Sequence, residues 1–371
     1  MASATRVVVI GGGIAGISVA AQLADSYDVV VVEQEFQPSY HSTGRSAAVL
    51  HLAFENDLVH RLTSMAEPFY RNPPTGFGQL AEEIVHIAFD TAENRDLVES
   101  FVADWIDRCP WLRLLDVGEL RAHAPLLSEQ FVVGSVDTRS LRLHVDAIVQ
   151  GFRGLLNARN GKLVGSKRVI QIERLPSAWQ VVFQDDESIE ADMLINAAGA
   201  WADDVATLAG IPRLGLQPRR RTGVIVEPAV DCSEHPMCYR ASGGIYFKPE
   251  GANLMVSPAD ATDSAPCDAQ PEDIDVAVVL ETLNECTTLN IQRPVSTWAG
   301  LRTFAADAQP VIGFDRADDQ FFWLAALGGF GIQTAPAYAK IAASILKDNQ
   351  LANLDLVSRD ELSPARFAAN T

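Results

Sequence analysis

The sequence predicts a mixed α/β (α+β) protein with two domains, and three observations support this prediction. The chain has 371 residues, which is roughly twice the length that one hydrophobic core usually serves. Hydrophobic residues make up 48% of it and charged residues 21%, the balance of an ordinary globular protein. β-Branched runs that lead through glycine turns into helical patterns occur near both ends, whereas alternating strand patterns fill much of the middle. We therefore expect a parallel-sheet domain into which a domain with a mixed β-sheet is inserted.

The first strand, turn and helix lie at the start of the chain. Residues 6–10 form a β-branched run of the kind buried in a parallel sheet, residues 11–16 a glycine turn, and residues 14–24 a helical pattern. A valine run at 29–32 predicts the next strand, which ends at Glu33. This βαβ order is typical of a Rossmann-like dinucleotide-binding domain.

The remaining elements follow from the same patterns. Helices are expected at 57–70, 93–108, 143–157 and 271–287, with a last helix that ends near Leu346. Strands are expected at 82–90, in a meander within 162–191, at 193–196, within 219–258 and at 321–326. The Pro73–Pro74 pair indicates a crossing between domains. We predict a discontinuous cofactor domain of residues 1–80, 145–215 and 300–371, and a substrate domain of residues 81–144 and 216–299.

Composition also excludes several kinds of partner. The 48 acidic and 29 basic residues give a formal net charge of −19, which repels phosphate backbones, so we expect no nucleic-acid partner. Five cysteines without a C-x-x-C pair indicate neither a disulfide framework nor a zinc site, so we expect no metal and a cytoplasmic location. Three consecutive glycines interrupt the apolar segment 7–24, so we expect no integral membrane segment.

The glycine turn has the spacing of a dinucleotide-binding loop. Gly11 permits the tight turn, Gly13 lets a pyrophosphate approach the backbone, and Gly16 lets helix and strand pack closely. Glu33 follows Gly11 by the interval expected for an acid that accepts hydrogen bonds from ribose hydroxyls, and it would repel a 2′-phosphate. A chance glycine-rich turn is the alternative, but the strand before it and the helix after it favour the binding loop.

Three further segments identify the kind of dinucleotide. Residues 40–48 (YHSTGRSAA), 196–201 (NAAGAW) and 328–331 (GGFG) resemble the flavin-dependent D-amino-acid oxidase superfamily. The order of segments, the chain length and residues 298–302 (WAGLR) resemble most the bacterial D-arginine dehydrogenase branch. This resemblance implies a two-domain flavoprotein that binds FAD and removes a hydride from the α-carbon of a D-amino acid. The resulting imine would hydrolyse to a 2-oxo acid and ammonia. Because no cysteine follows Cys286, we expect the FAD to be non-covalent.

The expected FAD contacts come from the glycine loop and its helix, the end of the second strand, the serine-rich loop of residues 40–48, one strand position and two later turns. Small residues such as Ala47 and Ala48 leave room above a flat ring, and serine and threonine hydroxyls can bind its polar edges. The full set is Gly11, Gly13, Ile14, Ala15, Gly16, Glu33, Gln34, Ser42, Thr43, Arg45, Ser46, Ala47, Ala48, Val169, Ala198, Gly199, Trp201, Arg302, Gly328, Gly329, Gly331, Ile332, Gln333 and Thr334.

A carboxylate clamp is the second expected feature. An amino-acid carboxylate must be desolvated beside the flavin, and arginine forks suit that task. By resemblance, Arg221 and Arg302 match the carboxylate-binding arginines and Tyr246 the tyrosine that joins them, and Gly329 completes the expected catalytic set. The neighbours of Arg221 in the sequence, Arg219 and Arg220, are expected at a solvated strand end, paired with acids.

Substrate specificity is where the sequence departs from the D-arginine branch. Glu83 best matches the acid that pairs with a cationic substrate side chain, with Glu82 as an alternative, and this favours basic substrates. Val49 and Phe54 stand where the branch has a histidine and a tyrosine, and Arg240 lies close to a position that has lost an acid. We therefore expect basic or broad specificity, with a neutral, aromatic or N-substituted amino acid fitting equally well.

Two other functions compete with D-amino-acid oxidation. One is an oxidase of a secondary amino acid such as sarcosine, which belongs to the same superfamily. The other is a non-catalytic flavoprotein module, which loss of Arg302 or Tyr246 would have favoured, yet both residues are present. The electron acceptor, whether a quinone, a carrier protein or oxygen, is a further expected partner that the sequence does not identify.

Overall fold

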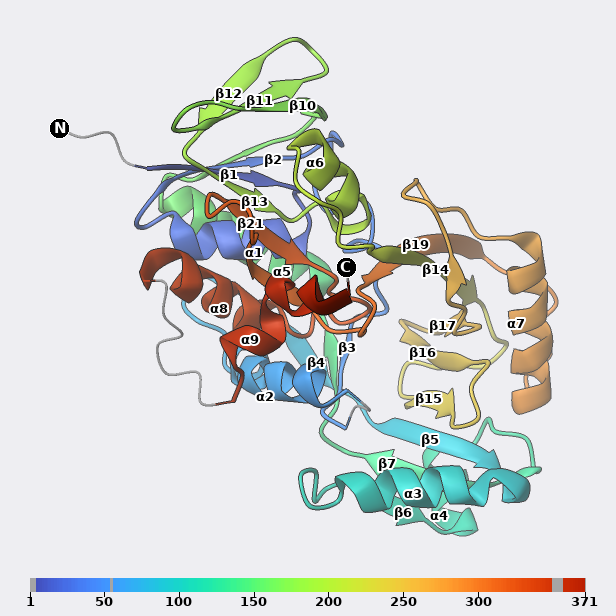
Figure 1. The fold of residues 1–371 in the computed structure, drawn as a ribbon. Helices are drawn as coiled ribbons and strands as arrows, with labels where there is room; N and C mark the ends of the chain where they lie inside the picture. The colour runs from blue at the N-terminus through green and yellow to red at the C-terminus, as the bar shows by residue number, and fades with distance from the viewer. Residues whose placement is uncertain (1–4, 54–55, 349–355, 371) are drawn as a thin grey trace.

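The computed structural model describes residues 5–53, 56–348 and 356–370 and confirms a mixed α/β fold (Figure 1). A six-stranded sheet has the order β20 (Val311–Phe314), β21 (Phe321–Ala325), β13 (Met193–Asn196), β1 (Arg6–Ile10), β2 (Asp28–Val32) and β9 (Lys162–Val164). Strands β21 to β9 run parallel, and β20 is an antiparallel edge strand. This sheet is the Rossmann-like part that the glycine loop predicted.

Alternation along β1 and β2 explains why both faces of this sheet are covered. Val7, Val9 and Val29 belong to a hydrophobic cluster with α1 (Ile14–Leu23), α2 (Asp57–Arg71), α5 (Val145–Ala158) and α8 (Ala335–Asp348). Val8 and Val30 face the opposite cluster, built with α6 (Ala202–Leu208) and a small sheet of β10 (Val169–Arg174), β11 (Trp179–Phe183) and β12 (Ser188–Ala191). Consecutive apolar residues are therefore required, because successive side chains enter different cores.

The second large sheet is mixed and has nine strands. Its order is β18 (Thr262–Asp263), β14 (Gln217–Val226), β17 (Asn253–Ser257), β16 (Tyr246–Glu250), β15 (Met237–Arg240), β5 (His86–Thr91), β7 (Phe131–Asp137) and β6 (Arg113–Leu115), and β19 (Ser296–Phe304) pairs with β14. β15 and β5 are parallel neighbours, whereas the other pairs are antiparallel. Helices α7 (Asp273–Cys286) and α4 (Val117–His123) contribute to its core, and α3 (Arg95–Trp105) packs on β5 and β7.

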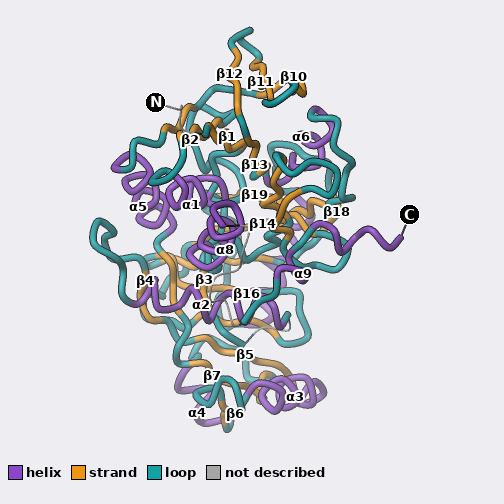
Figure 2. Tube along the Cα trace, turned by 60° about the vertical axis from the view of Figure 1, so that its left-hand side comes forward, coloured by secondary structure: helices purple, strands orange, loops and turns teal. Residues whose placement is uncertain are grey.

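A small third sheet joins β3 (Val49–Leu50), β8 (Leu141–Leu143) and β4 (Ala81–Glu83). The remaining elements are the helix α9 (Arg359–Leu362) and the 3-10 turns η1 (Ala92–Asn94), η2 (Gly199–Trp201) and η3 (Pro364–Asn370). Figure 2 shows the β10–β12 sheet at one end of the molecule and α3, α4 and β5–β7 at the other. Strands of the six-stranded sheet come from the segments predicted for the cofactor domain, but β19 crosses the expected boundary at residue 300. The domain boundaries stay a prediction.

Two sequence expectations were wrong in detail. The expected strand at 82–90 is two strands, because β4 pairs with β8 in the small sheet whereas β5 pairs with β7 and β15 in the large one. The expected meander within 162–191 begins only at Val169, because β9 pairs in parallel with β2 at the edge of the six-stranded sheet. Hydrophobic alternation predicts that a residue is in a strand, but not which sheet takes it up.

Candidate active site

A cavity of about 720 Å³ lies between the two large sheets. On one side are residues at the carboxyl ends of the parallel strands, including Ile10, Val32 and Ala325. On the other side are residues of β14, β15, β16 and β19. Ligands of open α/β sheets bind at the carboxyl ends of their strands, so this cavity is the candidate site.

Gly11 and Gly16 shape the turn at the floor of the cavity. Gly11 has a φ of +116°, and a Cβ on it would lie 2.3 Å from the carbonyl oxygen of Ala197. A Cβ on Gly16 would lie 1.9 Å from the Gly11 carbonyl oxygen. Gly16 itself does not line the cavity; its contribution is the close packing of α1 against the turn.

The N-terminus of α1 is suited to an anion. Its first turn contains no acidic residue, and the Gly13 cap makes no side-chain hydrogen bond. The Ile14 N–H donates to Thr43 Oγ1 at 3.0 Å, so the serine-rich loop is fixed directly above this helix end. Both Gly13 and Ile14 line the cavity. A helix N-terminus of this kind fits the pyrophosphate of a dinucleotide.

Glu33 is held at the edge of the same turn. Its side chain is buried, and Oε2 accepts a hydrogen bond from the Gly12 N–H at 2.6 Å while Oε1 accepts one from the Glu35 N–H at 2.9 Å. The carboxylate lines the cavity at the end of β2. Its position therefore fits the ribose contact expected from the sequence, which stays a prediction.

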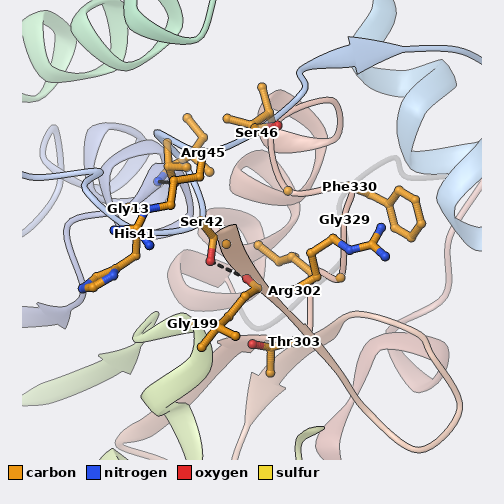
Figure 3. A pocket seen from close by; sticks show the side chains of 18 of the residues that line it. Gly13, His41, Ser42, Arg45, Ser46, Gly199, Arg302, Thr303, Gly329 and Phe330 are labelled. Carbon is orange, nitrogen blue, oxygen red and sulfur yellow. Dashed lines mark hydrogen bonds between the residues drawn. The ribbon is translucent and has the colours of Figure 1, made fainter. Parts of the chain in front are cut away.

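The serine-rich loop at 40–48 is hydrogen-bonded to β19 on the opposite side of the cavity. Ser42 Oγ donates to the Leu301 carbonyl at 2.5 Å, which Figure 3 shows as a dashed line. Arg45 donates to the Ala299 carbonyl at 2.8 Å and forms a 2.5 Å ion pair with Asp268. These bonds fix the loop relative to the strand that carries Arg302.

The structure brings nearly all the expected cofactor residues to this cavity. Gly16 and Thr334 are the exceptions; Thr334 is buried in the turn before α8, where its hydroxyl donates to the Phe330 carbonyl at 2.7 Å. The expected residues that line the cavity are Gly11, Gly13, Ile14, Ala15, Glu33, Gln34, Ser42, Thr43, Arg45, Ser46, Ala47, Ala48, Val169, Ala198, Gly199, Trp201, Arg302, Gly328, Gly329, Gly331, Ile332 and Gln333. The residues present therefore fit FAD.

The second expected feature, a pair of arginines, lies at the same cavity. Arg221 on β14 and Arg302 on β19 line it together with Tyr246 on β16. Arg221 Nε donates to the Asp260 carbonyl at 2.5 Å, and its Cζ lies 5.8 Å from the centroid of the Tyr246 ring. Asp260 thus anchors Arg221, a role that the sequence did not suggest.

Arg302 differs from Arg221 because its Nε is buried without a hydrogen-bond partner among the described residues. Burial, together with the charge of Arg221, lowers the pKa of Arg302 to about 10. Figure 3 shows its side chain extending toward Gly329 and Phe330. A Cβ on Gly329 would lie 2.8 Å from Arg302 Nη1, so this glycine leaves space for the guanidinium. An anionic ligand group would relieve the repulsion between the two cations.

Arg219 and Arg220 pair with acids outside the cavity. The Arg219 side chain is 43% exposed and bonds to Asp263 at 3.0 Å. Arg220 pairs with Glu272 and with Asp275, but its side chain is only 13% exposed, so the expectation that it is solvated was wrong. Successive side chains of a strand point to opposite faces, so the Arg220 side chain lies on the other face of β14 from Arg219 and Arg221. There it pairs with acids at the start of α7.

The expected side-chain pocket requires three corrections. Glu83 does not line the cavity: its side chain is 76% exposed and pairs with Arg71 at 3.1 Å, because β4 is an edge strand of the small sheet. Glu82, the alternative, is also exposed. Arg240 lies on the opposite face of β15, with Nε 3.8 Å from Asp90. Val49 does line the cavity, and Phe54 lies outside the described residues.

The sequence reasoning missed several cavity residues, among them three whose rings lie side by side. His51 follows β3, His86 begins β5, and Tyr239 is on β15. The His51 and His86 rings lie 4.8 Å apart between centroids, as do those of His86 and Tyr239. Met237 and Tyr239 are two residues apart on β15, so strand alternation could have assigned Tyr239 to the face that lines the cavity. No local sequence pattern links the two histidines. His41, which also lines the cavity, bonds to Glu35 at 2.9 Å.

Comparison with known proteins agrees with this geometry. A family model described as FAD dependent oxidoreductase matches residues 6–345. The chain belongs to this family. FAD is therefore its cofactor, and the protein is an FAD-dependent oxidoreductase.

Relatives of this FAD-dependent oxidoreductase are distant. The Xenopus laevis FAD-dependent oxidoreductase domain-containing protein 1 is 23% identical over 95% of this chain and 81% of its own length. The structure of L-proline dehydrogenase from P. horikoshii has a TM-score of 0.84 at 20% identity, covering 99% of both chains. Glycine oxidase from Geobacillus kaustophilus has a TM-score of 0.82 at 18% identity, covering 94% of this chain and 96% of its own. These likenesses show the fold.

No helix in the described part of the chain is both long and apolar enough to cross a membrane.

Proposed function

We propose that this oxidoreductase removes a hydride from the α-carbon of an amino acid, leaving an imine that water hydrolyses to a 2-oxo acid and ammonia. The observation that carries the proposal is the Arg221–Arg302 pair, in which the Nε of Arg302 has no protein partner among the described residues. A substrate carboxylate would supply the missing negative charge and accept from the planar donors. When bound, FAD supplies the hydride acceptor.

The residues around the pair support this role. The backbone carbonyl of Asp260 accepts a hydrogen bond from Arg221 Nε and so anchors this side chain. Gly329, which has no Cβ, leaves space for the Arg302 guanidinium to reach a ligand. Tyr246, beside Arg221, would add a hydroxyl donor to the same carboxylate. With the carboxylate anchored at fixed points, the α-carbon–hydrogen bond has a defined direction, which is the main requirement of hydride transfer. A non-catalytic module would not need this arrangement.

We propose the D-configuration for the substrate, on the strength of the resemblance to the D-arginine dehydrogenase branch. Reversing the α-carbon between fixed arginines would turn the C–H bond away from the cofactor. A preference for basic side chains is no longer proposed, because Glu83 faces solvent. A small-molecule amino acid remains the proposed partner.

We also propose a non-covalent cofactor and a cytoplasmic protein. All five cysteines are free thiols, as a reducing compartment favours. No cysteine is among the described residues that line the cavity, so none there can bond to the flavin. Acid precipitation should therefore release all of the yellow colour into the supernatant, and colour retained in the pellet would contradict a non-covalent cofactor.

Anaerobic flavin bleaching tests the proposed activity. Purified holoprotein would be mixed with matched D- and L-amino acids, with the N-methyl forms, and with the decarboxylated amines. We expect D-amino acids to bleach the flavin and the amines to react very poorly. Faster bleaching by L-forms would overturn the stereochemical proposal, and faster bleaching by N-methyl forms would identify a secondary-amine oxidase. If the amines react as well as the amino acids, the clamp does not bind a carboxylate. Reoxidation by oxygen, a quinone or a carrier would then be measured on the reduced protein.

A further inference from the structure

The cavity extends across the nine-stranded sheet beyond the arginine pair. Arg221 is on β14 and Tyr246 is on β16, two strands away in the sheet. Beyond β16, on the side away from β14, the next strands are β15 and β5. Tyr239 on β15 is the register partner of Tyr246, and His86 is on β5. Neighbouring strands lie about 4.8 Å apart, so His86 is on a strand about 10 Å from that of Tyr246. A substrate bound by its carboxylate would direct its side chain along this row.

The far end of the row is built from aromatic rings. His86 is 5% exposed, and its ring contacts both His51 and Tyr239 with centroid distances of 4.8 Å. The Nε2 of His86 is buried and has no hydrogen-bond partner among the described residues. An unpaired buried nitrogen is costly, so a ligand that bonds to it is favoured over one that does not.

Charge at this end differs from what a basic substrate requires. Burial lowers the pKa of His51 to about 4, and burial together with His51 lowers that of His86, so both rings are neutral near pH 7. The carboxylates among the described lining residues are Glu33 and Asp204, which belong to β2's end and to α6. Asp137 borders a small hollow behind the two histidines, where its carboxylate accepts from the Arg139 N–H at 2.8 Å.

We propose that His51, His86 and Tyr239 form the side-chain subsite of the enzyme, and that they select amino acids whose side chain ends in an uncharged hydrogen-bonding group such as a phenol, an amide or an indole N–H. This inference rests on the proposed oxidation of amino acids. The apolar residues Ala88, Met237 and Phe101 also line the cavity and suit the aliphatic or aromatic part of such a side chain.

The decisive experiment compares ligands that differ by a single polar group. D-tyrosine with D-phenylalanine, and D-asparagine with D-leucine, would be compared by kcat/KM in the holoprotein, with D-arginine and D-lysine alongside and the L-forms in parallel. We expect the polar member of each pair to be favoured about tenfold or more, because a site built for a hydrogen bond discriminates against an analogue that lacks it. Equal values within both pairs, or a preference for the cationic amino acids, would overturn the subsite.

Variants locate the effect. His86→Phe keeps a ring of similar size and should bring the ratio of kcat/KM within each ligand pair close to one, whereas His86→Gln, which keeps a side-chain donor and acceptor, should retain part of the preference. His235→Phe is the matched control, because His235 is also buried with an unpartnered Nε2 but is not among the residues that line the cavity. An unchanged preference in His86→Phe, or its loss in His235→Phe, would overturn the assignment.

A binding measurement separates this inference from the proposed reaction. 3-(4-Hydroxyphenyl)propanoate and 3-phenylpropanoate carry the carboxylate but no amine, so neither can be oxidised. The hydroxylated acid should bind the unmodified holoprotein about tenfold more tightly by titration of the flavin absorbance, a comparison that needs no variant. If the tighter binding is present but no amino acid of either configuration bleaches the flavin, the proposed reaction fails and the recognition of the polar group stands. Equal affinities would overturn the subsite even if D-amino acids are oxidised.

Discussion

At the scale of single residues, the most informative feature is the difference between Arg302 and Arg219. They are register partners on β19 and β14, yet Arg302 lines the cavity whereas Arg219 bonds to Asp263 at the surface. Arg302→Lys keeps the charge but loses the planar fork, so kcat/KM should fall by the equivalent of about 2–4 kcal/mol. Arg219→Lys should change it by less than about 0.5 kcal/mol. Steady-state kinetics with one good D-amino acid decides the comparison, and similar losses in both variants would rule the clamp out.

Glu83 provides a second residue-scale prediction. Its side chain is 76% exposed and pairs with Arg71 at 3.1 Å, and exposed pairs of this kind contribute about 0–1 kcal/mol. Glu83→Gln should therefore alter kcat/KM for D-arginine and for D-phenylalanine equally and by less than twofold. A selective loss toward D-arginine would show that Glu83 reaches the substrate after all.

These residues also show how far the sequence could predict the site. The glycine loop and Glu33 were found because their spacing has a physical reason, and the serine-rich loop was found by its resemblance to a known family; residues of all three line one cavity. Glu83 was misplaced because a match by position cannot show which way an edge strand faces. His51 and His86 were missed because they are brought together only by the pairing of β5 in the large sheet and of β3 in the small one. Pairing between distant strands is a tertiary property that periodicity does not contain.

At the scale of elements, the contact between α1 and its own turn sets how closely the helix approaches β1. A Cβ at Gly16 would lie 1.9 Å from a backbone oxygen, so Gly16→Ala must push the helix away from the turn. We expect a loss of about 3 kcal/mol in the free energy of unfolding, together with loss of FAD. Gly154→Ala is the control: it lies on the exposed side of α5, nothing is within 4 Å of its Cβ, and a gain of about 0.5–1 kcal/mol is expected. Urea unfolding measures both, and a stable, FAD-loaded Gly16→Ala protein would contradict the packing argument.

At the scale of the whole molecule, stability should fall as the pH decreases from 6.5 to about 4. Burial lowers the pKa of His51 to about 4 and that of His86 well below 6.5. Below pH 6.5 the unfolded chain binds protons at both imidazoles while the folded chain does not, so unfolding is favoured through this window. Above pH 6.5 neither state binds these protons and their contribution is constant. For His51 alone the loss reaches about 3 kcal/mol near pH 4.

Urea unfolding at pH 7, 5.5 and 4.5 tests this dependence. Carboxyl groups also titrate in this pH range, so the quantity compared is the slope of the free energy of unfolding against pH. His51→Gln and His86→Gln should each lose stability less steeply with decreasing pH than the unmodified protein. Parallel curves for all three proteins would show that the imidazoles are not kept neutral by burial.

The charge that lines the cavity is opposite in sign to the net charge of the whole molecule, which is −19. The charged residues lining the cavity are mostly basic, namely Arg45, Lys167, Arg168, Arg221 and Arg302 against Glu33 and Asp204. An approaching anion is therefore repelled at long range and attracted only within a few ångströms. Salt screens the long-range repulsion first, since the Debye length is about 10 Å at 0.1 M ionic strength. Capture of an amino acid with a net negative charge, such as D-aspartate, should thus become faster as salt is added, whereas capture of a zwitterion should hardly respond, so the molecule's own field acts as a long-range barrier against anionic substrates.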